Sequence, residues 1–231
     1  GSLEAMANAL REAEIPILRA EVGDIVPKDV SVASAVEEGT HRAILGFNVG
    51  LQEDAAEQAA QKNVELFRDD VIYQLIEDYE AHVEAIEKRQ REAVFENVIR
   101  PARFRVLRDH VFRQSGPAVV GVEVQTGTLG RNVPVGHLEN GEVERVGVLK
   151  TIQDEGEDLD ELRAGNRAAV SIEGPTVGRD LKEEDVLWVD LPENHAKVLE
   201  QELREDLPAD EREALNQFLE ARREKEPFWG K

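Results

Sequence analysis

The sequence predicts a chain of two folded parts joined by a long connecting helix. Short strands and helices alternate up to residue 69, which is typical of an α/β/α domain with a parallel sheet. Residues 70–99 then run without an internal glycine or proline, as one helix would. From Pro101 onward, short strands are separated by glycines, which favours an antiparallel β-barrel with C-terminal helices. The 231 residues are enough for two domains of ordinary size.

The first part, residues 1–69, is predicted to form a thin parallel sheet covered by helices. Ser2 is the predicted N-cap of the first helix, Pro27 the start of the second and Gly39 its end. In chain order we expect helix 3–14, strand 15–22, helix 27–38, strand 41–49, helix 53–63 and strand 64–67. Because no strand precedes the first helix, we expect the first strand of this domain to lie before Gly1, in a longer protein.

The connecting helix has an uneven apolar stripe. Its first half repeats apolar residues at helical spacing: Ile72, Leu75, Ile76, Tyr79, Val83 and Ile86. Residues 87–92 are all polar, and Val94, Phe95 and Val98 follow. We expect both ends to pack and the middle to be exposed, as in a strut about 44 Å long between two domains. An arm of a coiled coil is the alternative interpretation.

The second part is predicted to be a barrel over residues 100–192 and a helical tail over residues 193–231 packed on it. The expected strands are 104–107, 118–124, 133–138, 143–152, 167–172 and 186–190. Asn140 and Gly141 predict a tight hairpin between two of them. Residues 154–161 are expected to form an acidic loop, and residues 195–206 and 209–225 two helices.

The composition is strongly acidic, with 49 acidic and 28 basic residues and a formal charge of −21. Self-repulsion at this charge opposes folding, but at molar salt the Debye length falls to about 3 Å. A lysine-poor, acidic and globular chain therefore predicts a salty cytoplasm. The absence of cysteine excludes disulfides and thiolate metal sites. No apolar run is long enough for a membrane span, so no membrane partner is expected.

The sequence contains no recognisable catalytic constellation. No G-x-x-x-x-G-K-[ST] loop is present, the five histidines are isolated, and no serine or threonine lies in a nucleophile-elbow context. We therefore predict no catalytic residue, no metal site and no cofactor in this chain. The alternative is a small-molecule-binding α/β enzyme domain fused to a barrel. Its phosphate-binding turns would have only one glycine each, at Gly23 and Gly50.

Two clusters are candidate binding sites. Five arginines fall within 14 residues beside one acid, Asp109, and two phenylalanines, Phe104 and Phe112: Arg100, Arg103, Arg105, Arg108 and Arg113. They predict either a phosphate-facing surface for RNA or an arginine-faced strand that pairs with acids elsewhere. The tail repeats apolar residues at helical spacing, which indicates core packing or a partner groove: Leu199, Leu203, Leu207, Leu215, Phe218 and Leu219.

Several motifs in order resemble one family. Residues 1–12 (GSLEAMANALRE), 15–17 (IPI), 22–25 (VGDI) and 44–49 (ILGFNV) are similar to the third domain of translation initiation factor five-B, the archaeal and eukaryotic counterpart of bacterial initiation factor two. Residues 71–78 (VIYQLIED) resemble the start of its connecting helix. Residues 100–102 (RPA), 111–113 (VFR) and 117–122 (PAVVGV) resemble its fourth domain, and 177–180 (VGRD) and 227–230 (PFWG) its archaeal form.

The resemblance implies a function for the parent factor and roles for this chain. The parent would be a cytoplasmic GTPase that joins ribosomal subunits and stabilises methionyl initiator tRNA on the small subunit. Its GTP and Mg²⁺ would be bound by a G domain that this monomeric chain lacks. The barrel would contact the tRNA acceptor end, with direct contacts from Arg103, Arg105 and Arg113 and a pocket on the strands of Val122, Thr151, Arg167 and Ala168. The tail would bind initiation factor one-A through Leu203, Leu207, Leu215, Phe218 and Leu219.

Overall fold

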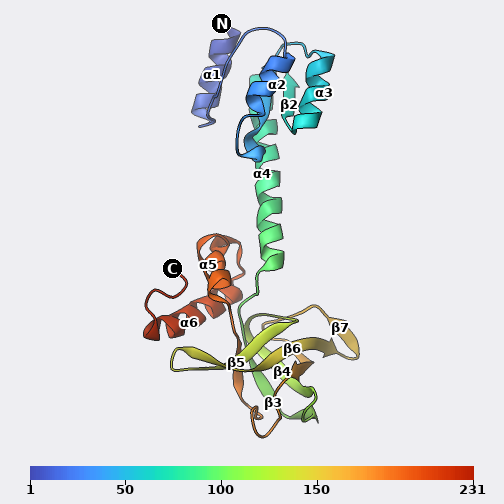
Figure 1. The fold of residues 1–231 in the computed structure, drawn as a ribbon, viewed down its shortest axis with the longest axis vertical. Coiled ribbons are helices and arrows are strands. Elements are labelled where there is room, and N and C mark those ends of the chain that lie inside the picture. The colour runs from blue at the N-terminus through green and yellow to red at the C-terminus, as the bar shows by residue number, and fades with distance from the viewer. The chain divides into compact units, whose positions relative to one another are not determined.

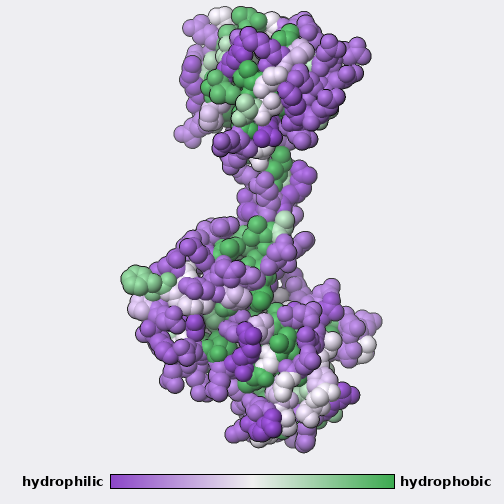
Figure 2. Space-filling model, in the orientation of Figure 1, coloured by the Kyte–Doolittle hydropathy of each residue, from purple (hydrophilic) through white to green (hydrophobic).

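A computed structural model describes all residues, 1–231, and they form two compact units, Gly1–Ala93 and Val94–Lys231. Figure 1 shows the helices of the first unit around β2, and the barrel with its helical tail in the second unit. Hydrophilic side chains cover most of the face drawn in Figure 2, as the acidic composition requires. The predicted combination of a parallel-sheet domain, a long helix and an antiparallel barrel is confirmed.

The first unit has a parallel sheet of two strands. β1 (Ala43–Phe47) pairs with β2 (Glu65–Asp69) in the register Ala43↔Glu65. Three shorter helices accompany the sheet: α1 (Ser2–Glu12), α2 (Pro27–Ala33) and α3 (Glu53–Lys62), with a 3₁₀ turn at Gly39–His41. Asn63 closes α3 in the left-handed conformation, which an asparagine tolerates.

The predicted strand over residues 15–22 is wrong. Ile15 and Ile17 pack against the cluster around Leu75, whereas Leu18 and Val22 are 70% and 88% exposed. The alternation of apolar and polar residues over 15–22 therefore arises because two isoleucines pack on a core. It does not arise from strand pairing. Pro16 also lacks an N–H that a neighbouring strand could use. The sheet accordingly has two strands and not the three that the sequence predicts.

Helix boundaries in the first unit also differ from the prediction, and the first helix ends at Glu12 and not at Glu14. α2 ends at Ala33 and not at Gly39, because the hydroxyl of Ser34 donates to Ser31 O (2.8 Å) and Arg42 Nε donates to Val36 O (2.6 Å), which holds an irregular turn. The first helix begins at Ser2, with Gly1 in the N-cap position that the sequence assigned to Ser2.

The long helix is present as α4 (Ile72–Asn97). Leu75, Ile76 and Tyr79 on its first turns are buried. Residues 87–94 are exposed, and Phe95 packs against the barrel core. The uneven stripe thus corresponds to burial at both ends of the helix and exposure between them.

The second unit is a closed antiparallel barrel. β3 (Ala102–Arg113), β10 (Val186–Val189), β5 (Val133–Glu139), β6 (Glu142–Asp154), β9 (Arg167–Glu173) and β4 (Ala118–Gly130) are neighbours in this order, and β3 pairs with β4 to close the ring. Asn140 and Gly141 have φ of 50° and 77° between β5 and β6, which confirms the predicted hairpin. The short strand β8 (Glu161–Arg163) pairs with the end of β4.

The acidic loop predicted over residues 154–161 is wrong, because β7 (Glu157–Leu159) folds back on β6 and pairs Leu159 with Ile152. Glu155 and Gly156, both with positive φ, make the turn. The tail contains α5 (Glu193–Gln201), a 3₁₀ turn at Arg204–Asp206, and α6 (Ala209–Lys225). α6 has the predicted bounds, whereas α5 ends five residues earlier than predicted. Both helices share one apolar core with the barrel.

Candidate nucleic-acid interface

Most arginines of the β3 cluster are engaged within the protein. Arg103 Nη1 donates to Gln217 Oε1 (2.9 Å), and its guanidinium lies 5.5 Å from the Trp188 ring. Arg105 lies 3.5 Å from Glu123. Arg105 therefore agrees with the second interpretation of the cluster, an arginine-faced strand that pairs with acids elsewhere, whereas Arg103 has neutral partners.

The last two arginines of the cluster differ from each other. Arg108 lies 3.7 Å from Glu184, both of them largely exposed. Arg113, the last residue of β3, is exposed and makes no ion pair or side-chain hydrogen bond. Next to it, Phe112 is 64% exposed. Of the three arginines predicted to contact RNA directly, Arg113 is therefore the one whose side chain has no partner within the protein.

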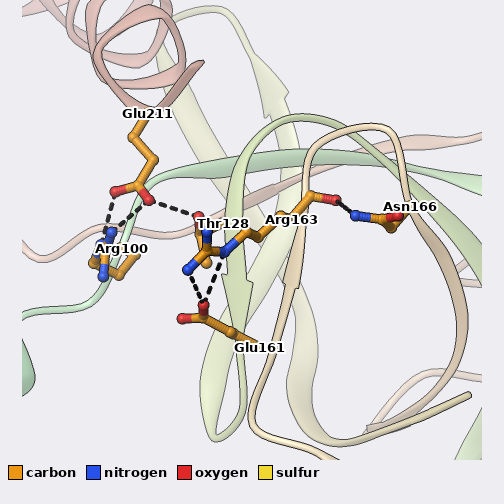
Figure 3. A network of polar contacts seen from close by, with 6 residues as sticks. All are labelled: Arg100, Thr128, Glu161, Arg163, Asn166 and Glu211. Atoms are coloured by element: carbon orange, nitrogen blue, oxygen red, sulfur yellow. Dashed lines mark hydrogen bonds and ion pairs between the residues drawn. The ribbon is translucent and has the colours of Figure 1, made fainter. Parts of the chain in front are cut away.

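Arg100 belongs to a buried network at the junction of barrel and tail (Figure 3). Glu211, at the start of α6, is 1% exposed and accepts hydrogen bonds from Arg100 Nε (2.7 Å) and from Thr128 Oγ1 (2.6 Å). Arg100 also stacks on Phe95, with 4.4 Å to the ring centroid. A buried carboxylate is tolerated when it is paired and hydrogen-bonded. The network therefore fixes α6 and the end of α4 to the barrel.

Sequence reasoning missed Glu211, since it is one acid among many in the first turn of a helix, and only the fold shows that it points inward. His195 was likewise expected to be isolated. Its Nδ1 accepts a hydrogen bond from the Ile99 backbone N–H (3.0 Å), so α5 also contacts the segment between α4 and the barrel.

The pocket implied by the resemblance is divided between two faces of the barrel wall. β4, β9 and β6 are neighbours, so the strands do come together. Val122 pairs directly with Ala168, and both are buried. Thr151 and Arg167 are exposed instead. Thr151 Oγ1 lies 2.6 Å from Ser171 Oγ, and Arg167 Nε donates to Glu123 Oε2 (2.5 Å). The four side chains therefore do not converge on one cavity.

The tail leucines lie in the core. All five residues predicted to bind a partner are at most 3% exposed: Leu203, Leu207, Leu215, Phe218 and Leu219. In this structure they hold α5 and α6 on the barrel, which was the first of the two interpretations. A partner of the tail would meet other residues.

The chain end is fixed on these helices. Trp229 packs on Phe218, and Arg223 donates to Trp229 O (3.0 Å) and to both carboxylate oxygens of Glu200 (2.9 and 2.6 Å). The hydrogen bond from Arg223 lowers the pKa of Glu200 below its ordinary value.

Residues 1–80 match a family model described as translation-initiation factor 2, and residues 100–188 match one described as elongation factor Tu domain 4. The whole chain is 63% identical to a probable translation initiation factor IF-2 of Halobacterium salinarum and 61% identical to that of Haloarcula marismortui, in each case over 38% of the relative. This chain belongs to the archaeal translation initiation factor IF-2 family.

The fold of this family member agrees with a solved structure. The crystal structure of GDP-bound aIF5B from Aeropyrum pernix matches 99% of the chain with a TM-score of 0.56 and 34% identity, and the match covers 38% of that protein. The chain therefore spans well under half the length of its relatives and corresponds to their C-terminal part. The halophilic relatives agree with the predicted salty environment.

Two further features were sought in this IF-2 family member, a metal site and a membrane-spanning helix. The structure brings together no group of three or more histidines, aspartates or glutamates able to hold a metal ion. No helix is both long and apolar enough to cross a membrane.

Proposed function

We propose that this chain is the binding half of an initiation factor that promotes ribosomal subunit joining and holds methionyl initiator tRNA on the small subunit. The observation that supports this most is the match of the entire chain, at 63% identity, to a probable translation initiation factor IF-2. GTP hydrolysis would belong to a G domain elsewhere in the longer protein, with its Mg²⁺. The relative from Aeropyrum pernix is described as GDP-bound.

In this proposal the barrel binds the acceptor end of the tRNA by short-range contacts. Arg113 is the most available of the predicted contact residues, and Arg103 and Arg105 lie on the same strand. In a salty cytoplasm, screening removes long-range attraction to phosphates, and counterion release contributes little. An affinity that depends on few phosphates and on the methionyl group would survive these conditions.

The tail is proposed to bind initiation factor one-A through the exposed sides of α5 and α6, which the buried leucines hold in place. The chain would act as a cytoplasmic monomer. No observation favours the alternative of a small-molecule enzyme domain.

The test is binding of chain 1–231 to methionylated and to uncharged initiator tRNA over a range of salt. We expect tighter binding of the methionylated form and a log–log salt slope of about two or less in magnitude. A steep slope without preference for the methionylated form would indicate nonspecific phosphate binding and contradict the proposal.

Calorimetry with GTP and Mg²⁺ tests the assignment of the nucleotide to another domain. We expect no heat of binding for chain 1–231. Micromolar binding would favour the enzyme alternative.

A further inference from the structure

The tip of the β3–β4 hairpin carries an exposed pair of aromatic rings, His110 and Phe112, which we call the aromatic platform. The ring centroids lie 6.4 Å apart at an interplanar angle of 84°. Single exposed apolar side chains are common on proteins and need no explanation. This pair differs because the backbone around it is shaped to display it.

The two residues of the platform each lie within an irregularity of the β3–β4 ladder. The register shifts between Val106 and Val111 and again between Val111 and Arg113, where Phe112 is the extra residue. Asp109, inside the first irregularity, has φ of 57°. Bulges of this kind re-aim side chains and are over-represented beside functional sites.

The histidine of the platform is held in place from two sides. Its Nδ1 donates to Arg108 O (2.6 Å). On the opposite strand, a Cβ at Gly121 would lie 2.7 Å from His110 Cβ, so the glycine makes the space in which His110 lies. The tip itself is attached to the rest of the barrel, since Val177 N donates to Gln114 O (2.9 Å). The His110 ring and the backbone of the tip are therefore held in place.

One positive charge next to the platform, that of Arg113, has no partner, although Asp109 beside His110 is an exposed acid. Among the arginines in the strands, Arg113 alone has no ion pair or side-chain hydrogen bond. The nearby acids Glu183 and Glu184 are already engaged, by the Asp109 N–H (2.8 Å) and by Arg108. In a chain of charge −21, an unpaired arginine beside two exposed rings matches a ligand with a flat aromatic face and a negative charge.

We propose that the aromatic platform binds an unstacked base of single-stranded RNA, with Arg113 on the adjoining phosphate. The proposal rests on the proposed RNA-binding function of the barrel and gives it a contact site. Stacking on aromatic side chains is tolerant of sequence and does not depend on long-range charge, so it persists at the salt concentration that screens phosphates.

The experiment measures binding of chain 1–231 at molar KCl to an eight-nucleotide oligoadenylate and to an abasic oligomer of the same length and charge. The wild-type chain should bind oligoadenylate more tightly. Phe112→Ala should weaken that binding roughly 5- to 100-fold and bring it near the abasic value. Arg113→Gln should weaken binding to both oligomers similarly and reduce the salt slope by about one.

Phe228→Ala is the matched control, because Phe228 is 82% exposed but lies in the tail, beside Lys231. It should leave both affinities unchanged. Ultraviolet crosslinking of oligoadenylate should place the adduct within residues 110–113. No binding by wild type, no effect of Phe112→Ala, or an equal effect of Phe228→Ala would each overturn the proposal.

The oligoadenylate experiment and the tRNA experiment can fail independently of each other. If methionylated tRNA is preferred but oligoadenylate binding is insensitive to Phe112→Ala, the platform is wrong and the function stands. If Phe112→Ala weakens oligoadenylate binding but the methionyl group makes no difference, the platform stands and the proposed function is wrong.

Discussion

The two units of this chain bury their apolar residues in different ways. The first unit divides its core between two small clusters, one around Val30 that is rich in alanine and one around Leu75. The second unit has one continuous cluster that extends from the barrel strands to both tail helices and Trp229. A closed barrel has no free strand edges, whereas the two-stranded sheet has two. The second unit should therefore be the more stable one.

The distribution of charge should increase the difference in stability between the two units. Residues 1–93 carry 9 basic and 20 acidic residues, a net charge of −11, whereas residues 94–231 carry 19 and 29, a net charge of −10 over a longer segment. Self-repulsion is therefore denser in the unit with the smaller core. Measurements that compare the units belong at molar salt, where this repulsion is screened.

The largest expected effect is in the second unit. Arg100→Met would leave the Glu211 carboxylate buried with only Thr128 as a side-chain partner. Removing one partner of a buried pair costs about 3–5 kcal/mol. Thermal unfolding at molar KCl should show the barrel transition shifted down and the first unit unchanged. Arg163→Met, which breaks the exposed pair with Glu161, is the control and should cost about 1 kcal/mol or less. Equal effects would show that burial of Glu211 is unimportant.

A matched pair of core substitutions tests the comparison directly. Leu75 and Leu149 are both fully buried, one in each unit. Each change to alanine should cost about 2–5 kcal/mol. We expect Leu75→Ala to unfold the first unit while the barrel keeps its transition, and Leu149→Ala to leave both units folded with a lower barrel melting temperature. The reverse result would mean that the small clusters are the more stable cores.

The long helix provides a third test, because its middle is exposed and gains nothing from packing. Gln90→Pro removes a backbone hydrogen bond within α4 and should cost about 3 kcal/mol of helix stability. Far-ultraviolet circular dichroism should show lost helix, with both unit transitions retained. In the full-length factor we expect slower subunit joining and nearly unchanged tRNA binding. Joining at the normal rate would contradict the proposed role as a rigid strut.

Patterns that depend on local chemistry could be read from the sequence. Asn140 and Gly141 predicted their hairpin because few other residues accept positive φ, and the bounds of α6 followed from helical spacing between Pro208 and Pro227. The prediction for residues 15–22 was wrong, since two isoleucines packed on the cluster around Leu75 give the same alternation as a strand. The clearest site features depend on tertiary contacts. Neither the burial of Glu211 nor the lack of a partner for Arg113 has a sequence signal.

The smallest expected effect concerns the tail, and it tests whether the tail and barrel unfold together. Hydrogen bonding to Arg223 lowers the pKa of Glu200, so the folded state binds this proton less readily than the unfolded state. The resulting stabilisation is complete above the unfolded carboxyl pKa, about 4.3, and is lost as pH falls through the lower folded value. Glu200→Gln should remove that part of the pH dependence and cost about 1 kcal/mol or less at neutral pH.

The Trp229 indole N–H signal in NMR spectra reports on the chain end that Arg223 holds. If acid displaces Trp229 in the wild type before the barrel melts, and Glu200→Gln displaces it already at neutral pH, the tail is a separate, weaker unit. If both change only with the barrel, the continuous core makes tail and barrel one cooperative unit.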